Sequence, residues 1–163
     1  MTKRNIIIAA AVVLGLGAWY AFRPERAFID KSVNESLASI ASASETAGMP
    51  MTLASGAFHS NAHETIGNAA VLSLPDGRRI LRLTNFSTSN GPDVRVYLVA
   101  ASDVTDDETV KQAGFVELGP MKGNKGDQNY DVPADLDLDT FRTVTIWCKR
   151  FSVNFGSAPL ASS

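Results

Sequence analysis

The sequence predicts an all-β domain, an antiparallel β-sandwich of about seven to nine short strands, preceded by two N-terminal helices. Short segments in which apolar and polar residues alternate recur between residues 51 and 160. This period of two is typical of half-buried strands. Turn signals rich in Gly and Pro separate the segments, most clearly at Pro75-Asp76-Gly77. Regular strands with frequent turns favour a sandwich over a mixed α/β fold.

The N-terminus predicts a membrane anchor. Lys3 and Arg4 precede an apolar run over residues 6–22, close to the shortest length that spans a bilayer. Trp19 and Tyr20 stand at its far end, where aromatic side chains favour the headgroup region. We expect an uncleaved signal anchor over residues 1–23, in a single-pass protein of the cell membrane whose C-terminal domain is extracytoplasmic. Cleavage after Ala18 is the alternative.

Residues 24–50 are expected to form a stalk. Ile29, Val33, Leu37 and Ile40 recur at spacings that place them on one helical face. The spacing predicts an amphipathic helix over residues 24–47, ended by Gly48 and Pro50. Its apolar stripe would pack on the domain, pair with another copy, or lie on the lipid surface.

The domain itself is expected over residues 51–160. Two strands joined at residues 75–77 form a predicted hairpin, and an acidic stretch near residues 102–112 suits a helical turn. The expected strands are 54–60, 68–74, 79–86, 93–101, 115–118, 128–132, 141–148 and 151–155.

The segment 143–155 contains the only cysteine, Cys148. Val144, Ile146 and Cys148 share one parity, whereas Phe151, Val153 and Phe155 share the other. One unbroken strand cannot bury both sets on one side, so we expect a bulge or tight turn near Lys149–Arg150, with Cys148 pointing inward. Cys148 then has two interpretations. It is a small hydrophobe of the core, or a redox thiol beside two cations that favour its thiolate.

Composition excludes several classes of function. The net charge is −2 and no basic stripe is present, which argues against a nucleic-acid partner. A single cysteine rules out an internal disulfide. The chain has no GxSxG motif and no phosphate-binding P-loop, so a hydrolase or transferase is disfavoured.

Several short motifs follow one another between residue 53 and about residue 160. They are Gly56-Ala57-Phe58, His63 with Gly67, Leu83-Thr84-Asn85-Phe86, Gly91-Pro92-Asp93, Val96-Tyr97-Leu98, 126–133, 144–151 and Phe155-Gly156. In their order and spacing these motifs resemble the DM-thirteen family, often described as an electron-transfer domain. The resemblance implies an extracytoplasmic β-sandwich in which Cys148 serves redox transfer with an envelope partner. It would do so as a bare thiol or by holding a group such as haem.

The only histidines, His59 and His63, are candidate cofactor ligands beside Cys148. Their spacing matches no zinc motif, and hydrogen-bonded loop histidines are the alternative. A calcium site among the aspartates at 131, 135, 137 and 139 is disfavoured, because their alternation with leucines suits a solvated edge, and no metal site is predicted. A second functional hypothesis is a non-catalytic envelope binding module. In it Cys148 is structural, and the loops 87–93 and 122–127 meet a partner.

Overall fold

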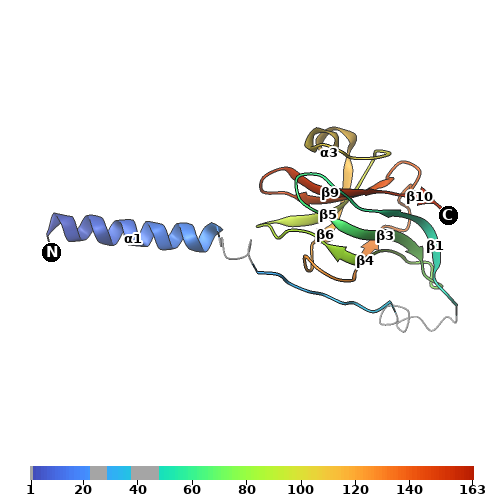
Figure 1. Ribbon diagram of the computed structural model, residues 1–163, viewed down its shortest axis with the longest axis horizontal. Helices are drawn as coiled ribbons and strands as arrows, with labels where there is room; N and C mark the ends of the chain where they lie inside the picture. The colour runs from blue at the N-terminus through green and yellow to red at the C-terminus, as the bar shows by residue number, and fades with distance from the viewer. Residues whose placement is uncertain (1, 23–28, 38–47) are drawn as a thin grey trace.

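The computed structural model describes residues 2–22, 29–37 and 48–163. The first element is helix α1, Lys3–Phe22, which Figure 1 shows as a rod outside the β domain. Its window Lys3–Tyr20 is long and apolar enough to cross a membrane, a property that signal sequences share. The expected N-terminal apolar helix is therefore present.

The rest of the described chain is mostly β, in two antiparallel sheets of five strands each. The first has the order β10-β1-β3-β4-β7 and the second the order β2-β9-β8-β5-β6. The strands are β1 Met51–Ala57, β2 His59–Ser60, β3 Ile66–Ser73, β4 Arg79–Ser87, β5 Val94–Val99, β6 Phe115–Pro120, β7 Gln128–Val132, β8 Thr143–Cys148, β9 Val153–Pro159 and β10 Ala161–Ser162. The predicted hairpin is confirmed: β3 pairs with β4 across the turn that contains Gly77, whose φ is +85°.

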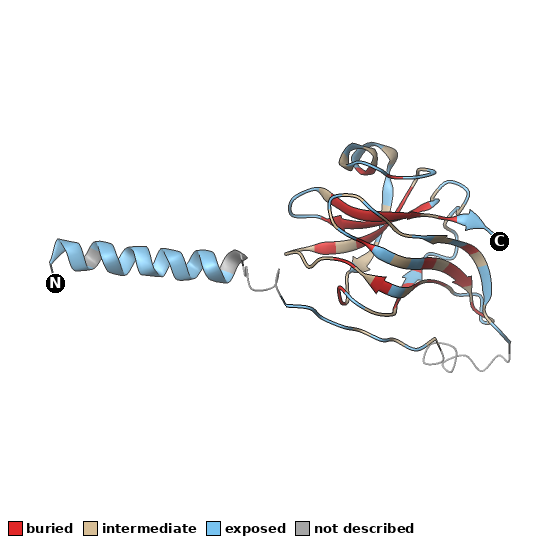
Figure 2. Ribbon diagram, viewed as in Figure 1, coloured by how far each residue is buried: buried red, intermediate tan, exposed pale blue. Residues whose placement is uncertain are grey.

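One cluster of buried residues contains side chains from both sheets. The first sheet contributes residues such as Val71 and Leu83, and the second contributes Val96, Ile146 and Cys148. Figure 2 shows the buried segments concentrated in the middle of the domain, with exposed segments at its loops. Apolar burial of this kind is the main force that holds strands together.

The outer face of the second sheet is also covered. Helix α3, Asp107–Ala113, lies in the stretch where a helical turn was expected. Its buried residue Val110 packs in a cluster with Tyr97 and Trp147. Every residue of β8 is therefore buried, which simple alternation did not predict.

The predicted stalk helix is wrong for the described residues 29–37, which are extended and non-helical. We call this segment the strap. Ser32 forms a parallel bridge with Lys125, and Val33, Glu35 and Leu37 are half-buried while the residues between them are exposed. This period of two is that of a strand, and its cause is backbone pairing with the domain. The rest of the predicted stalk, 24–28 and 38–47, lies outside the described residues.

The predicted break after Cys148 is confirmed, and of the two expected forms it is the tight turn. Residues 149–152 form a tight turn, with Ser152 at a φ of +54°. Phe151 is 60% exposed in this turn, so the expectation that it points inward is wrong. A second irregularity follows, because Trp147 pairs with Asn154 and Ile146 with Gly156. Phe155 is the extra residue of this bulge, and it turns into the core.

Candidate functional site

Cys148 lies at the last position of β8 and is only 1% exposed. It points into the shared core, as the sequence predicted, and pairs across the sheet with Val94 and Val153. Its sulfur is a free thiol. A group enclosed in this way is out of reach of soluble oxidants and of other thiols while the domain is folded.

The cation next to the cysteine has another partner. The Lys149 ammonium lies 3.0 Å from a carboxylate oxygen of Glu117, and Arg95 contacts the other oxygen at 2.6 Å. The Lys149 hydrogen bond is the largest influence that holds the pKa of Glu117 below its ordinary value. The positive charge expected beside the thiol is thus partly neutralised by Glu117.

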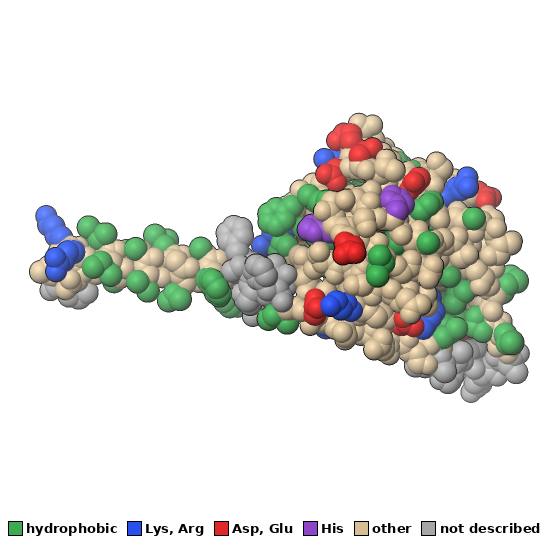
Figure 3. All heavy atoms as spheres, viewed as in Figure 1, with side chains coloured by type: hydrophobic (Ala, Val, Ile, Leu, Met, Phe, Trp, Pro, Cys, Tyr) green, Lys and Arg blue, Asp and Glu red, His purple; other side chains and the backbone are tan. Residues whose placement is uncertain are grey.

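The two candidate histidines lie on one face of the domain (Figure 3) but have different surroundings. His59, on β2, has its Nε2 2.8 Å from a carboxylate oxygen of Asp103. His63 follows in a loop, and its ring centroid lies 3.9 Å from that of Phe155. Its backbone N–H donates to the Phe155 carbonyl at 3.2 Å.

Phe155 connects His63 to the region of the thiol. The ring of Phe155 belongs to the same core cluster as Cys148. Gly91 allows a loop to approach here, since a Cβ on it would lie 2.7 Å from Val94 and 3.1 Å from the Phe155 ring. His63 therefore packs on a ring of the core cluster that also contains Cys148, whereas His59 pairs with Asp103.

This region does not fit a haem. The thiol is buried among apolar side chains, and a macrocycle bound to it would displace the core around Val94 and Val153. Among the described residues, no group of three His, Cys, Asp or Glu side chains is placed to hold a metal ion. Asp137 instead accepts hydrogen bonds from the Thr140 hydroxyl and the Asp139 amide within a turn.

The strap forms an extensive contact that sequence reasoning missed. The amides of Val33 and Glu35 each donate to the domain, to the carbonyls of Lys125 and Asp127, at 2.9 Å. The Lys31 amide donates to Asn124 at 2.7 Å. Leu37 packs on the outer face of the first sheet, against the cluster Leu72, Leu74 and Ile80. The strap therefore covers part of the loop 122–127, which the binding-module hypothesis predicted to contact a partner.

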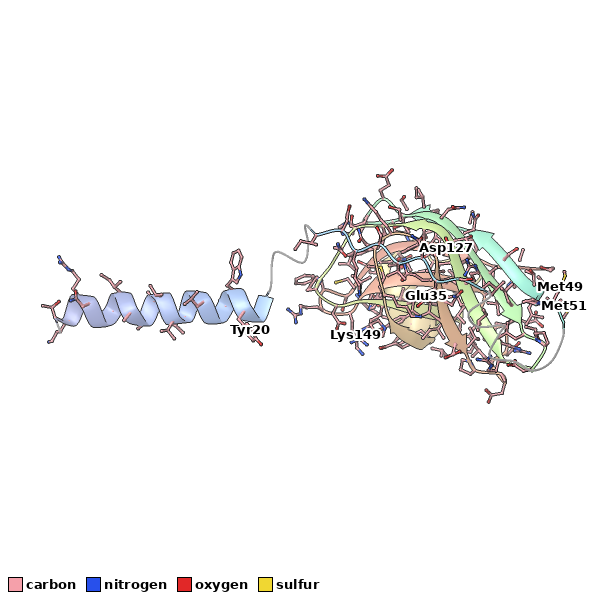
Figure 4. All side chains as sticks on the ribbon, turned by 90° about the horizontal axis from the view of Figure 1, so that it is seen from below. Tyr20, Glu35, Met49, Met51, Asp127 and Lys149 are labelled. Carbon is pink, nitrogen blue, oxygen red and sulfur yellow. The ribbon has the colours of Figure 1, made fainter. Side chains whose placement is uncertain are left out.

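Glu35 is the electrostatic centre of this contact (Figure 4). Its carboxylate accepts hydrogen bonds from the Lys122 ammonium at 2.8 Å and from the Asn129 amide at 2.8 Å. Its backbone carbonyl accepts from Arg82 at 3.0 Å. Burial opposes ionisation of the carboxyl, but these hydrogen bonds outweigh it and lower the pKa of Glu35.

Two glycines let the strap come this close. A Cβ on Gly123 would lie 2.4 Å from the Lys31 carbonyl oxygen, and one on Gly126 would lie 2.1 Å from that of Val33. Gly126 also has a φ of +94°, which favours glycine. The Gly-rich stretch near residue 123 was the one sequence signal for this contact, because a glycine backbone permits close approach. It does not indicate which segment approaches.

The strap begins beside the other loop of the second hypothesis, 87–93. The Asn90 side-chain amide donates to the Ile29 carbonyl, and Asp30 pairs with Lys125. An open polar cavity of about 370 Å³ lies between the start of the strap and this loop. It is lined by Asp30, Glu64, Ile66, Ser87, Thr88, Ser89, Asn90 and Lys125. This loop therefore keeps an accessible surface, unlike the covered part of 122–127.

Comparison with known proteins places the domain in a family. No curated protein and no solved structure matches the chain. A family model described as Electron transfer DM13 matches residues 57–160, more than half of the chain. The match includes Cys148, both histidines and the two loops discussed above. The chain therefore belongs to the electron transfer DM13 family.

Proposed function

We propose that the chain is a membrane-anchored, extracytoplasmic electron-transfer domain whose redox residue is Cys148. Family membership is the observation that carries this proposal. Helix α1 supports the anchor, because its length and apolar composition suit a bilayer span. The core cluster shared by both sheets supports a β-sandwich as the fold of the exported part.

The burial of Cys148 restricts how it would work. Thiol–disulfide exchange needs direct attack on sulfur, which a side chain 1% exposed does not permit. Electron tunnelling needs no such contact. The thiol would lose one electron to a one-electron acceptor of the cell envelope, and its proton would pass to water admitted by opening of the turn 149–152. Of the two histidines, His63 is the one that packs on a ring of the core cluster containing Cys148.

Voltammetry of the purified full-length chain, adsorbed on an electrode, tests this role. We expect a one-electron signal that is lost in Cys148→Ala. The matched control is Val94→Ala, which loosens the same core next to Cys148 but keeps the sulfur. A signal of equal size in both variants would overturn the role of the thiol.

A second candidate function is favoured by the burial itself. In this alternative Cys148 is a core residue, and the domain is a binding module that meets its partner through the accessible loop 87–93. It predicts a wild-type chain without an electrode signal. It also predicts that Cys148→Ala keeps any envelope partner recovered by crosslinking, whereas Asn90→Ala and Ser89→Ala reduce its recovery.

A further inference from the structure

One end of the domain, which we call the proximal end, is formed by loop 87–93, the start of the strap and the turn 149–152. These parts are tied together. The Asn90 side chain binds the Ile29 carbonyl, and the Lys149 amide donates to the Asp93 carbonyl at 2.8 Å. Loop 87–93 thus joins the strap on one side to the turn on the other.

Three exposed large apolar side chains belong to this end or lie beside it. Ile29 is 61% exposed, Ile66 53% and Phe151 60%. Ile66 lines the same cavity as Asp30, which places it beside the start of the strap. Large apolar groups that stay exposed together are characteristic of surfaces that meet a protein or a membrane.

The covalent link to α1 limits where the proximal end can be. The chain between Phe22 and Ile29 spans at most about 25 Å even when fully extended. Since Ile29 is held by Asn90, the proximal end cannot lie farther than this from the end of the helix. Trp19 and Tyr20, in the last turn of α1, are suited to the lipid headgroup region.

The strap prevents the domain from turning over. It docks from Ile29 to Leu37 along the domain, so its whole length, and not a single point, fixes the direction of the chain. The opposite end of the domain carries Met51, which pairs with Ser73 at the end of β3 away from Ile66. Figure 4 shows Lys149 on the side of α1 and Met51 on the far side.

We propose that the proximal end docks on the bilayer that holds α1, with the Phe151 ring inserted at the lipid interface and Ile29 and Ile66 beside it. This inference rests on the membrane anchoring proposed above. It assigns to the turn 149–152 a lipid partner, and it places the end of β8 that carries Cys148 next to the membrane.

The charges of this end favour an apolar contact over an electrostatic one. Lys125 pairs with Asp30 and Lys149 with Glu117, so these two cations near the turn have acidic partners. A lone aromatic ring binds a membrane weakly. Tethering by α1 raises its effective concentration at the bilayer, so a weak contact becomes well populated. Zwitterionic lipid is therefore sufficient.

Spin labels on the full-length chain in phosphatidylcholine vesicles test the docking. A label is placed at Phe151→Cys, with Met51→Cys, 62% exposed at the far end, as the matched control. The native thiol is buried and does not compete for the reagent. We expect the Phe151 site to gain access to oxygen and lose access to a water-soluble nickel chelate, relative to the Met51 site.

A third label, at Leu14→Cys within α1, separates this inference from the proposed anchoring. If the Leu14 site is lipid-exposed and the Phe151 site is as accessible to nickel as the Met51 site, docking is refuted and anchoring stands. If the Leu14 site is itself aqueous, both fail. A Phe151 label that is immobilised but shielded from oxygen and nickel alike would indicate a protein partner and would also refute lipid docking.

Releasing the strap tests its part in the orientation. Gly126→Ala would place a Cβ in overlap with the Val33 carbonyl. Gly77→Ala also puts an alanine at a position with positive φ, but nothing lies within 4 Å of its Cβ. We expect the lipid signature at the Phe151 site to be lost in Gly126→Ala and kept in Gly77→Ala, with the Leu14 site unchanged in both. An undiminished signature in Gly126→Ala would show that the strap does not set the orientation.

Discussion

The substitution Gly126→Ala should detach the strap without unfolding the domain. The added Cβ would lie 2.1 Å from the carbonyl oxygen of Val33 and 3.1 Å from its carbonyl carbon. Asn34 Oδ1 would also lie 2.6 Å away, but the two Val33 atoms are backbone, so a change of the Asn34 rotamer alone does not relieve the overlap. Either the strap or the loop that carries Gly126 must move.

The strap is the part that yields, because it is only weakly held. Ordering residues 29–37 costs roughly 10 kcal/mol in backbone entropy. The hydrogen bonds of the strap, at about 1 kcal/mol each, and the half-burial of Val33 and Leu37 contribute a stabilising free energy of similar size. The net binding of the strap is therefore a few kcal/mol at most, less than the overlap would cost.

Hydrogen exchange measures the result directly. The amides of Val33 and Glu35 both donate to the domain and should be protected in the native chain. We expect this protection to fall to that of free peptide in Gly126→Ala, with the amides of β3 and β4 unchanged.

Gly77→Ala is the control for strain alone. Its glycine has a φ of +85° and open space around it, so it shares the cost of about 1–2 kcal/mol for a left-handed alanine but touches no strap atom. Protection of Val33 and Glu35 should remain there. If Gly126→Ala leaves both amides as protected as Gly77→Ala does, the reasoning from close approach is wrong.

Three other contacts give measurable outcomes. Cys148→Ser, which buries a hydroxyl in an apolar core, should be about 1 kcal/mol less stable in urea unfolding than Cys148→Ala; equal midpoints would mean that the site has a polar partner. The pKa of Glu35 is lowered in the folded state, so its stabilising effect is present above the ordinary value of 4.5 and is lost as the pH falls through the folded value. Strap protection in hydrogen exchange should weaken over that range, whereas a flat response, or the same response in Glu35→Gln, would contradict this role. Asp106→Ala removes the cap that accepts from the Thr109 amide at 2.7 Å and should lower stability by about 1 kcal/mol. Glu108→Ala, in the same exposed turn of α3, should be nearly neutral, and a thermal melt that cannot separate the two would refute the capping role.

The two sheets were largely predictable because their signals are local. Both kinds of signal involve only a few neighbouring residues, so they can be recognised in the sequence. Examples are the alternation in 94–99 and the turn Pro75-Asp76-Gly77. The inward direction of Cys148 followed from the parity of Val144 and Ile146 in the same way. The family resemblance, confirmed over residues 57–160, followed from motifs in a fixed order.

The strap was not predictable from its own residues. Ile29, Val33 and Leu37 are spaced by four, which places them on one face of a helix and equally on one face of a strand. What decides between the two is the backbone of a loop about 90 residues later, where Gly123 and Gly126 admit a partner. The sequence pattern of the strap does not indicate that it will pair with the loop 122–127.

By itself, the sequence determined the apolar helix, the strands and the side of the sheet on which the thiol lies. Only the tertiary structure decided how deeply that thiol is buried, because the core around it is built by side chains of both sheets, from segments far apart in the chain. Tertiary structure also separated the environments of the two histidines, giving His59 a carboxylate and His63 an aromatic ring. Local patterns arise from neighbours in sequence, whereas burial and pairing depend on contacts between segments that are distant in sequence.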